Sequence, residues 1–267
     1  MKIKTIEKIL NNKFNAFVKS ITDKDVAKLV KQNTLISGGC IASMLLNEDV
    51  NDYDLYFTNR ETVFAVTKYF VDKFIKAQGK SYTHTITIED TDDRIAIRIA
   101  SDGKASYTES SKNINKYQPI FLTSNAITLN NKIQLINRFY GDAEEIHKNF
   151  DYVHATNYWL SSTRKVYVNQ KALESLFTKE LKYIGSLYPL CSIFRLRKFL
   201  KRGFYINAGE MLKIMWGVNS LDLHNINVLR EQLIGVDVSY FHFLLKDLDK
   251  KGDVSYDYIC ELIDKIF

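Results

Sequence analysis

Residues 36–46, Ile-Ser-Gly-Gly-Cys-Ile-Ala-Ser-Met-Leu-Leu, and residues 51–57, Asn-Asp-Tyr-Asp-Leu-Tyr-Phe, decide how this chain folds. Together they predict a strand, a glycine turn, a short helix, a loop and a second strand. The adjacent Gly38 and Gly39 allow a tight turn and the close approach of a ligand to the backbone. Because the apolar residues that follow recur at helical spacing, the helix is expected to begin at about the second glycine. Its free amides favour a phosphate over the turn.

The second strand carries two carboxylates at a spacing that indicates a metal site. Side chains alternate along a strand, so Asp52, Asp54 and Tyr56 are expected on one face. Two carboxylates so close repel each other unless a cation joins them, and Mg²⁺ or Mn²⁺ prefers oxygen ligands. A phosphate cradle beside such a pair is what metal-assisted phosphoryl transfer requires. The stretch is not an EF-hand, because it lacks the central glycine and the distal glutamate of that loop.

Gly38-Gly39 followed by Asp52-Tyr53-Asp54 resembles the motif of the nucleotidyltransferase superfamily that includes DNA polymerase β, poly(A) polymerases and CCA-adding enzymes. The chain as a whole also resembles the nucleotidyltransferase-like proteins of tailed bacteriophages. The resemblance implies an α+β fold, with a mixed β-sheet flanked by helices and then a mostly α-helical domain. The sequence differs from the family motif at Cys40, because the family often has Ser or Thr directly after the glycines. Ser43, one helical turn later, is the alternative hydroxyl.

The resemblance implies a reaction and residues that carry it. By two-metal phosphoryl transfer, a nucleoside monophosphate would pass from an NTP, such as ATP, to a hydroxyl, and the expected acceptor is RNA, such as a tRNA end. Catalysis and the binding of Mg²⁺ or Mn²⁺ are expected of Asp52, Asp54 and a third acid on a neighbouring strand. Asp151, in a predicted strand at 150–155, is the candidate for that acid, and the acids at 142–145 are alternatives in a predicted helix start. The residues expected to bind the nucleotide are Ser37, Gly38, Gly39, Cys40, Ser43, Arg195 and Lys198.

Composition is that of an ordinary globular protein, with 267 residues, 46% hydrophobic and 25% charged. No stretch approaches the roughly 20 apolar residues that span a bilayer, and the N-terminus lacks the apolar core of a signal peptide. The cysteines at 40, 191 and 260 lie far apart, which argues against a zinc knuckle or a disulfide framework. We therefore expect a cytoplasmic protein, in the host cytoplasm if it is encoded by a phage.

Local patterns predict further elements. Asn59 is a good N-cap for a helix at 60–78, and Asn130-Asn131 suits a tight hairpin between two strands. Residues 101–118 are polar and without periodicity, which predicts a loop. Apolar spacing predicts helices at about 170–184, 189–202, 208–216, 228–234, 240–250 and 256–266, with glycines such as Gly203 and Gly217 near their ends.

The sequence predicts two domains, a nucleotidyltransferase domain at 1–157 and a basic helical domain at 158–267. Residues 160–215 contain eleven Lys or Arg against three Asp or Glu, and five of these cations lie between 195 and 202, interleaved with phenylalanines. Such a helix suits a nucleic-acid backbone or an incoming triphosphate. The alternative is a solvated helix face whose aromatic residues belong to the core.

Two other functions remain open from the sequence. One is a nucleotidyltransferase that acts on a small molecule or a protein. The other is a catalytically inactive nucleic-acid-binding or phage structural protein that retains the fold, in which Asp52 caps a turn and Asp54 is merely solvated. No nucleophile motif surrounds any Ser, Cys or His of the chain.

Overall fold

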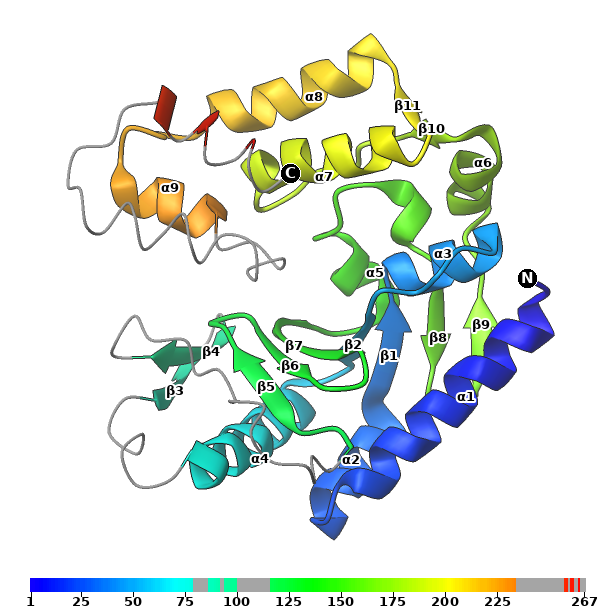
Figure 1. The fold of residues 1–267 in the computed structure, drawn as a ribbon, viewed down its shortest axis with the longest axis vertical. Helices are drawn as coiled ribbons and strands as arrows, with labels where there is room; N and C mark the ends of the chain where they lie inside the picture. The colour runs from blue at the N-terminus through cyan, green and yellow to red at the C-terminus, as the bar shows by residue number, and fades with distance from the viewer. Residues whose placement is uncertain are drawn as a thin grey trace. The chain divides into compact units, whose positions relative to one another are not determined.

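Figure 1 shows the fold in a computed structural model, which describes residues 1–78, 86–91, 94–99, 116–233 and residues 257, 258, 260, 261 and 264. The chain forms two compact units. Unit 1 comprises Met1–His147 and His154–Leu176, and unit 2 comprises Lys148–Val153 and Phe177–Phe267. The division differs from the boundary predicted after residue 157, because the strand at 158–160 pairs within the sheet of unit 1.

Unit 1 is built on a seven-stranded sheet in the order β5-β6-β7-β2-β1-β8-β9. β2 and β7 are parallel, and every other neighbouring pair in this sheet is antiparallel. The predicted fold class, a mixed sheet with flanking helices and a largely helical second part, is confirmed. The strands are β1 (Thr34–Ser37), β2 (Tyr53–Phe57), β5 (Pro119–Leu122), β6 (Ala126–Leu129), β7 (Ile133–Tyr140), β8 (Tyr158–Leu160) and β9 (Lys165–Tyr167).

A separate antiparallel pair in unit 1 joins β3 (Ile86–Thr91) to β4 (Arg94–Ile99). In β4, Arg98 pairs with Glu89 across the hairpin, with 2.8 Å between the guanidinium Nε and the carboxylate. The predicted turn at Asn130-Asn131 is confirmed as the β6–β7 hairpin, in which Leu129 is opposite Ile133.

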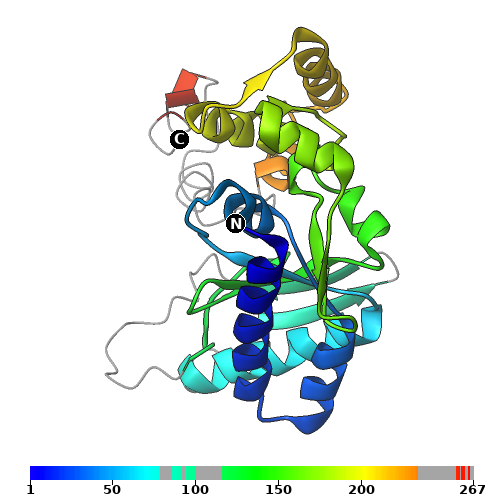
Figure 2. The ribbon, with the colours of Figure 1, turned by 90° about the vertical axis from the view of Figure 1, so that its right-hand side faces the viewer.

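The helices of unit 1 are α1 (Ile3–Ser20), α2 (Lys24–Asn33), α3 (Gly39–Leu46), α4 (Arg60–Gln78), α5 (Ala143–His147) and α6 (Gln170–Thr178). Side-chain caps fix where two of them begin. The carboxylate of Asp23 accepts from the amides of Asp25 and Val26 at the start of α2, and Asn59 accepts from the amide of Thr62 at the start of α4. In Figure 2, α1 (dark blue) runs nearly upright beside the sheet, and α4 (cyan) runs across the view behind α1.

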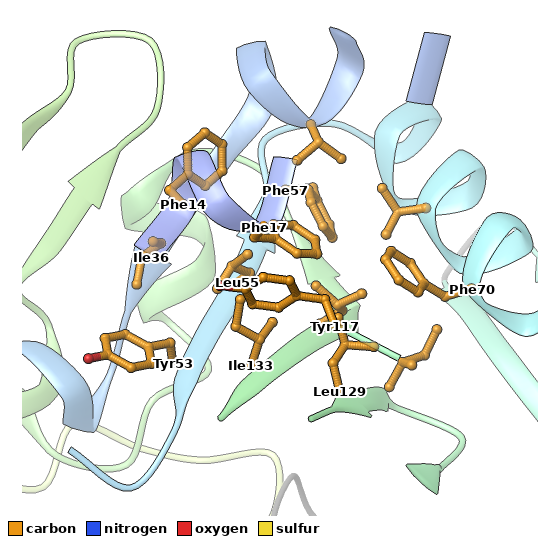
Figure 3. Close-up of a cluster of buried hydrophobic side chains, with 14 of the residues drawn as sticks. Phe14, Phe17, Ile36, Tyr53, Leu55, Phe57, Phe70, Tyr117, Leu129 and Ile133 are labelled. Carbon is orange, nitrogen blue, oxygen red and sulfur yellow. The ribbon is translucent and has the colours of Figure 1, made fainter. Parts of the chain in front are cut away.

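One face of the sheet carries the hydrophobic core. Figure 3 shows Phe14 and Phe17 of α1, Leu55 of β2, Phe70 of α4 and Ile133 of β7 converging there. A row of buried apolar residues crosses the strands on this face in register: Ile127, Leu135, Leu55, Ile36 and Trp159. Because side chains alternate along each strand, the residues between them lie on the opposite face.

Unit 2 contains the helices α7 (Pro189–Lys201), α8 (Ala208–Asn219) and α9 (Ile226–Leu233) and the parallel two-residue strands β10 (Glu180–Leu181) and β11 (Tyr205–Ile206). The helix predicted at 170–184 is shorter in the structure. It ends at Thr178, because Lys179 adopts a left-handed conformation with φ 58°. Gly203, with φ 80°, ends α7 as predicted. Gly217 does not end a helix: it lies inside α8, where a Cβ would come within 3.1 Å of Pro189.

The predicted strand at 150–155 is wrong. Residues 153–155 form a single 3₁₀ turn, and before it Tyr152 makes only an isolated bridge to Tyr183. The backbone amides of Ile184 and Val153 donate to Asp151 and Lys182, which holds the segment within unit 2.

Several predictions fall outside the described residues: most of the loop expected at 101–118, the helix expected at 240–250 and most of the one expected at 256–266. Within the described ranges, none of the helices has both the length and the hydropathy of a membrane span.

Candidate active site

The glycine turn lies at the junction of β1 and α3. β1 ends at Ser37, Gly38 adopts φ 90° and ψ −152°, and α3 begins at Gly39. This backbone conformation is restricted to glycine, which explains the first glycine of the pair. The amides of the first turn of α3 have no partner within the helix, so the turn ends in a set of backbone donors.

Asp54 lies directly against this turn. It opposes Ser37 in the antiparallel pairing of β1 with β2, which places it beside the end of β1. A Cβ built on Gly38 would be 3.0 Å from Oδ2 of Asp54. The carboxylate and the turn are therefore in contact, as metal-assisted binding of a phosphate requires.

Asp52 precedes β2 and is exposed, whereas Asp54 is half-buried in the strand. Burial raises the pKa of the Cys40 thiol, and the charges of Asp54 and Asp52 raise it further. The charges of both carboxylates therefore reach the buried thiol at the start of α3. Cys40 stays protonated and directs its thiol toward the carbonyl of Ser37, 3.6 Å away. It can offer a nucleotide its backbone amide, but not its side chain.

Gly39 differs from Gly38 in its surroundings: apart from its chain neighbours and the backbone of α3, no atom of the described residues lies within 4 Å of a Cβ built there. Gly39→Ala is expected to leave the free energy of unfolding within about 0.5 kcal/mol of wild type. Gly38→Ala is expected to cost about 1–3 kcal/mol, because Ala is strained at φ 90°. Urea unfolding of the two variants tests this contrast. If both are equally stable, the turn does not depend on the conformation of Gly38.

Ser37 supports the turn instead of facing a ligand. It is fully buried, and its hydroxyl donates to the carbonyl of Asn157 at 2.9 Å and lies 2.8 Å from Nε2 of His147. Because the hydroxyl proton is engaged in the bond to that carbonyl, Nε2 of His147 donates in the hydrogen bond between His147 and Ser37. The amide of Gly38 donates to the carbonyl of Ala155 at 3.2 Å. Residues 155–157 and α5 therefore hold the end of β1 in place, a role of His147 that no pattern in the sequence indicated.

Burial lowers the pKa of His147 from 6.5 to about 4, against an opposing effect of Asp142. The unfolded chain therefore takes up a proton below pH 6.5 that the folded protein does not bind until about pH 4. The contribution of His147 to the free energy of unfolding has its full value above pH 6.5. It falls as the pH drops from 6.5 toward 4, by at most about 2 kcal/mol between pH 7 and 5.

His147→Gln keeps a donor toward Ser37 and is expected to remove this part of the pH dependence of urea unfolding. His224→Gln, at an exposed position of unit 2, is the matched control and should leave it unchanged. An identical pH dependence in wild type and His147→Gln would show that His147 is not the group responsible.

Ser43 is also buried, at 7% exposure, in the last half of α3, where its carbonyl accepts from the amide of Glu48 at 2.8 Å. It therefore offers little surface to a nucleotide. The hydroxyl that the superfamily often has after the glycines has no exposed equivalent at Ser43.

Asp151 and Arg195, predicted as a metal ligand and a nucleotide ligand, form an ion pair with each other inside unit 2. The side chains are 5% and 20% exposed, respectively. Lys198, by contrast, is exposed on α7. A catalytic role for Asp151 stays a prediction, but the strand on which that prediction relied is absent.

The phenylalanines interleaved with these cations belong to the core of unit 2. Phe194 and Phe204 are buried, and the ring of Phe199 packs against Tyr152 and Phe204 at centroid distances of 5.6 and 5.8 Å. They are not available to stack on bases. The alternative interpretation of this helix, a solvated basic face over an aromatic core, is correct for its aromatic residues.

The donor set of the site fits a hard divalent cation shared with a phosphate. Among the residues that the structure describes, no three or more His, Cys, Asp or Glu side chains gather as a metal cage. Mg²⁺ is commonly held by one or two carboxylates together with substrate phosphates and water. Asp52 and Asp54 would supply the two carboxylates, and the start of α3 would take the phosphate.

Unit 1 also has a groove of about 1130 Å³ between α2 and α4. Its cationic side chains are Lys68, Lys73, Lys76 and Lys116. Of its two acids, Asp23 is engaged as the cap of α2. The groove contains none of the predicted site residues and no pair of acids on one strand, so its size does not make it the site of group transfer.

Residues 8–179 match the family model described as Gabija anti-defense 2 family protein. The chain belongs to the Gabija anti-defense 2 family. A curated relative, Gabija anti-defense 2 of Bacillus phage SPbetaL7, is 22% identical over 246 residues, covering 90% of this chain. The chain spans 50% of the length of that relative. The part that matches the Gabija anti-defense 2 model contains the glycine turn, both carboxylates and Asp151, and it ends before Arg195.

Solved structures similar to this chain include a Thermotoga maritima CCA-adding enzyme complexed with tRNA, with a TM-score of 0.42 and 11% identity over 77% of this chain and 45% of that one. An apo form of a CCA-adding enzyme gives a TM-score of 0.44 and 11% identity over 91% of this chain and 51% of that one.

Proposed function

We propose that this member of the Gabija anti-defense 2 family is a metal-dependent nucleotidyltransferase that moves a nucleoside monophosphate from an NTP to a hydroxyl. The observation that carries the proposal is the contact of Asp54 with the glycine turn, where a Cβ on Gly38 would meet its Oδ2 at 3.0 Å. A carboxylate beside the N-terminus of a helix repels a phosphate bound there unless a cation lies between them.

In the proposed reaction, backbone amides would bind the phosphates and carboxylates would bind the metal. The amides at the start of α3 hold the phosphates that leave, and Asp52 and Asp54 hold Mg²⁺ or Mn²⁺. The acceptor hydroxyl forms a bond to the α-phosphorus, the bond from the α-phosphorus to the bridging oxygen breaks, pyrophosphate leaves, and the hydroxyl proton passes to solvent. When bound, the metal lowers the pKa of the acceptor hydroxyl and neutralises the phosphates.

For the acceptor, we propose RNA, bound in part through exposed cations of α7 such as Lys198 and Lys201. Lysines at a surface contribute sequence-independent contacts to phosphates. For the biological role, we propose that the reaction helps a phage to counter a bacterial defence system in the host cytoplasm, on the basis of the family to which the chain belongs.

Incubation of the purified protein with each α-labelled NTP, Mg²⁺ or Mn²⁺, and pools of host RNA, DNA and protein tests the proposal. We expect label to enter RNA with the wild-type protein and not with the variant that carries Asp52→Ala and Asp54→Ala. Equal labelling by that variant, or no binding of a metal–NTP complex by the wild type, contradicts the proposal. Labelling of protein or of a small molecule instead of RNA replaces the acceptor only.

A second candidate function is binding of the nucleotide without transfer, for instance to sequester it. The ion pair between Asp151 and Arg195 favours this candidate, because it engages the acid proposed for the third position. Calorimetry with Mg²⁺ and NTP separates the two functions: binding with no labelled product in any acceptor pool is the result expected of a protein that only binds.

A further inference from the structure

The sheet face opposite the core carries a row of polar side chains across neighbouring strands. Thr128 of β6 pairs with Gln134 of β7, Gln134 with Asp54 of β2, Asp54 with Ser37 of β1, and Ser37 with Tyr158 of β8. These residues alternate with the apolar row that enters the core, so they share one face. The polar row passes the glycine turn, because Asp54 contacts Gly38.

The next positions along the same face are apolar. Leu35, Tyr56, Ala126 and Ile136 are all at most 5% exposed. The polar row is therefore not a general property of this face but a feature of the end that adjoins α3. Gln134 and Thr128 are only half-buried, so neither is enclosed as the apolar residues of this face are.

Gln134 occupies the position next to Asp54 on the strand away from Ser37. In a parallel pair, residues in register stand side by side about 4.8 Å apart on the same face. The two sheet neighbours of Asp54 are thus a glutamine and a serine, and neither is an acid. A third carboxylate is not supplied by either strand that flanks β2.

We propose that Gln134 is a further ligand-contacting residue of the site, and that its neutral amide makes the binding of the metal depend on the nucleotide. The amide can offer its oxygen to the cation and its NH₂ group to a phosphate oxygen. Two carboxylates hold a divalent cation weakly by themselves, and the phosphates of the nucleotide complete its ligands. A third carboxylate here would raise the affinity for the cation in the absence of the nucleotide. The inference rests on the proposed function.

Titration with Mn²⁺, followed by electron paramagnetic resonance of the free ion, tests the inference with and without an NTP analogue whose α–β bridge is methylene. For the wild type, we expect Mn²⁺ affinity to rise at least about 10-fold when the analogue is present. Gln134→Glu should bind Mn²⁺ without the analogue at least about 10-fold more tightly than the wild type does, because the substitution adds a third carboxylate beside Asp54. Neither readout depends on turnover.

Thr128→Glu is the matched control, because it adds the same charge to the same row one strand farther from Asp54. It should change Mn²⁺ affinity by less than about 3-fold, as the added charge is about 4.8 Å more distant. Gln134→Ala covers the case in which Gln134→Glu does not fold, and should weaken binding of the Mn²⁺–nucleotide complex about 3- to 10-fold.

The outcomes separate this inference from the proposed function. If the wild type binds no Mn²⁺–nucleotide complex, the proposed function fails. If the wild type binds the complex but Gln134→Glu behaves like Thr128→Glu, or Gln134→Ala binds as the wild type does, the proposed function stands and the role of Gln134 is overturned.

Discussion

Asp54→Ala is expected to lower the rate of nucleotide incorporation by at least about 1000-fold. The carboxylate lies against the turn that would hold the phosphates, so under the proposed function its loss would remove a metal ligand where charge develops. Several kcal/mol of transition-state stabilisation depend on such a ligand, and each 1.4 kcal/mol is a factor of ten in rate. Initial rates of label transfer at saturating Mg²⁺ and NTP measure the effect.

Asp49→Asn is the control for Asp54→Ala, because Asp49 is an exposed acid in the loop that leads to β2. Its rate should remain within about 2-fold of wild type, in line with a surface substitution away from the site. Circular dichroism establishes that both variants are folded. An Asp54→Ala variant that is folded and retains a tenth or more of the wild-type rate would place the metal elsewhere.

Asp151→Ala is expected to destabilise unit 2 by about 2–4 kcal/mol, because it leaves the guanidinium of Arg195, which is only 20% exposed, without its carboxylate. Arg195→Met should also be costly. The double variant Asp151→Ala with Arg195→Met should lose less than the sum of these two single variants by more than about 1 kcal/mol. Hydrogen exchange of the α7 amides in the full chain measures the local stability directly.

Arg197→Met is the matched control on the same helix. Its partner Asp264 is 75% exposed, and Arg197 itself is 45% exposed, so the loss should be within about 1 kcal/mol. Equal effects of Arg195→Met and Arg197→Met would mean that the Asp151–Arg195 pair is no more than a surface contact. A large loss of stability in Asp151→Ala would also mean that its loss of activity cannot by itself identify a metal ligand.

Local features of the fold followed from the sequence, since they depend on residues near one another in the chain. The start of α3 at the second glycine, the cap of α4 at Asn59 and the hairpin at Asn130-Asn131 are set by backbone freedom and side-chain capping. The spacing of the carboxylates relative to the glycines also predicted that the acidic strand adjoins the glycine turn, and Asp54 does contact Gly38. Periodicity failed at 170–184, where Lys179 ends the helix without a glycine or a proline.

Only the tertiary structure decided which side chains meet. The neighbours of Asp54 are set by strand order and register, which pair it with Ser37 and Gln134, far away in the sequence. The pairing of Asp151 with Arg195 and the support of Ser37 by His147 likewise join residues with no shared pattern. Sequence periodicity reports which face a residue occupies, because that depends on its own strand or helix. The partner across that face depends on the packing of the whole chain.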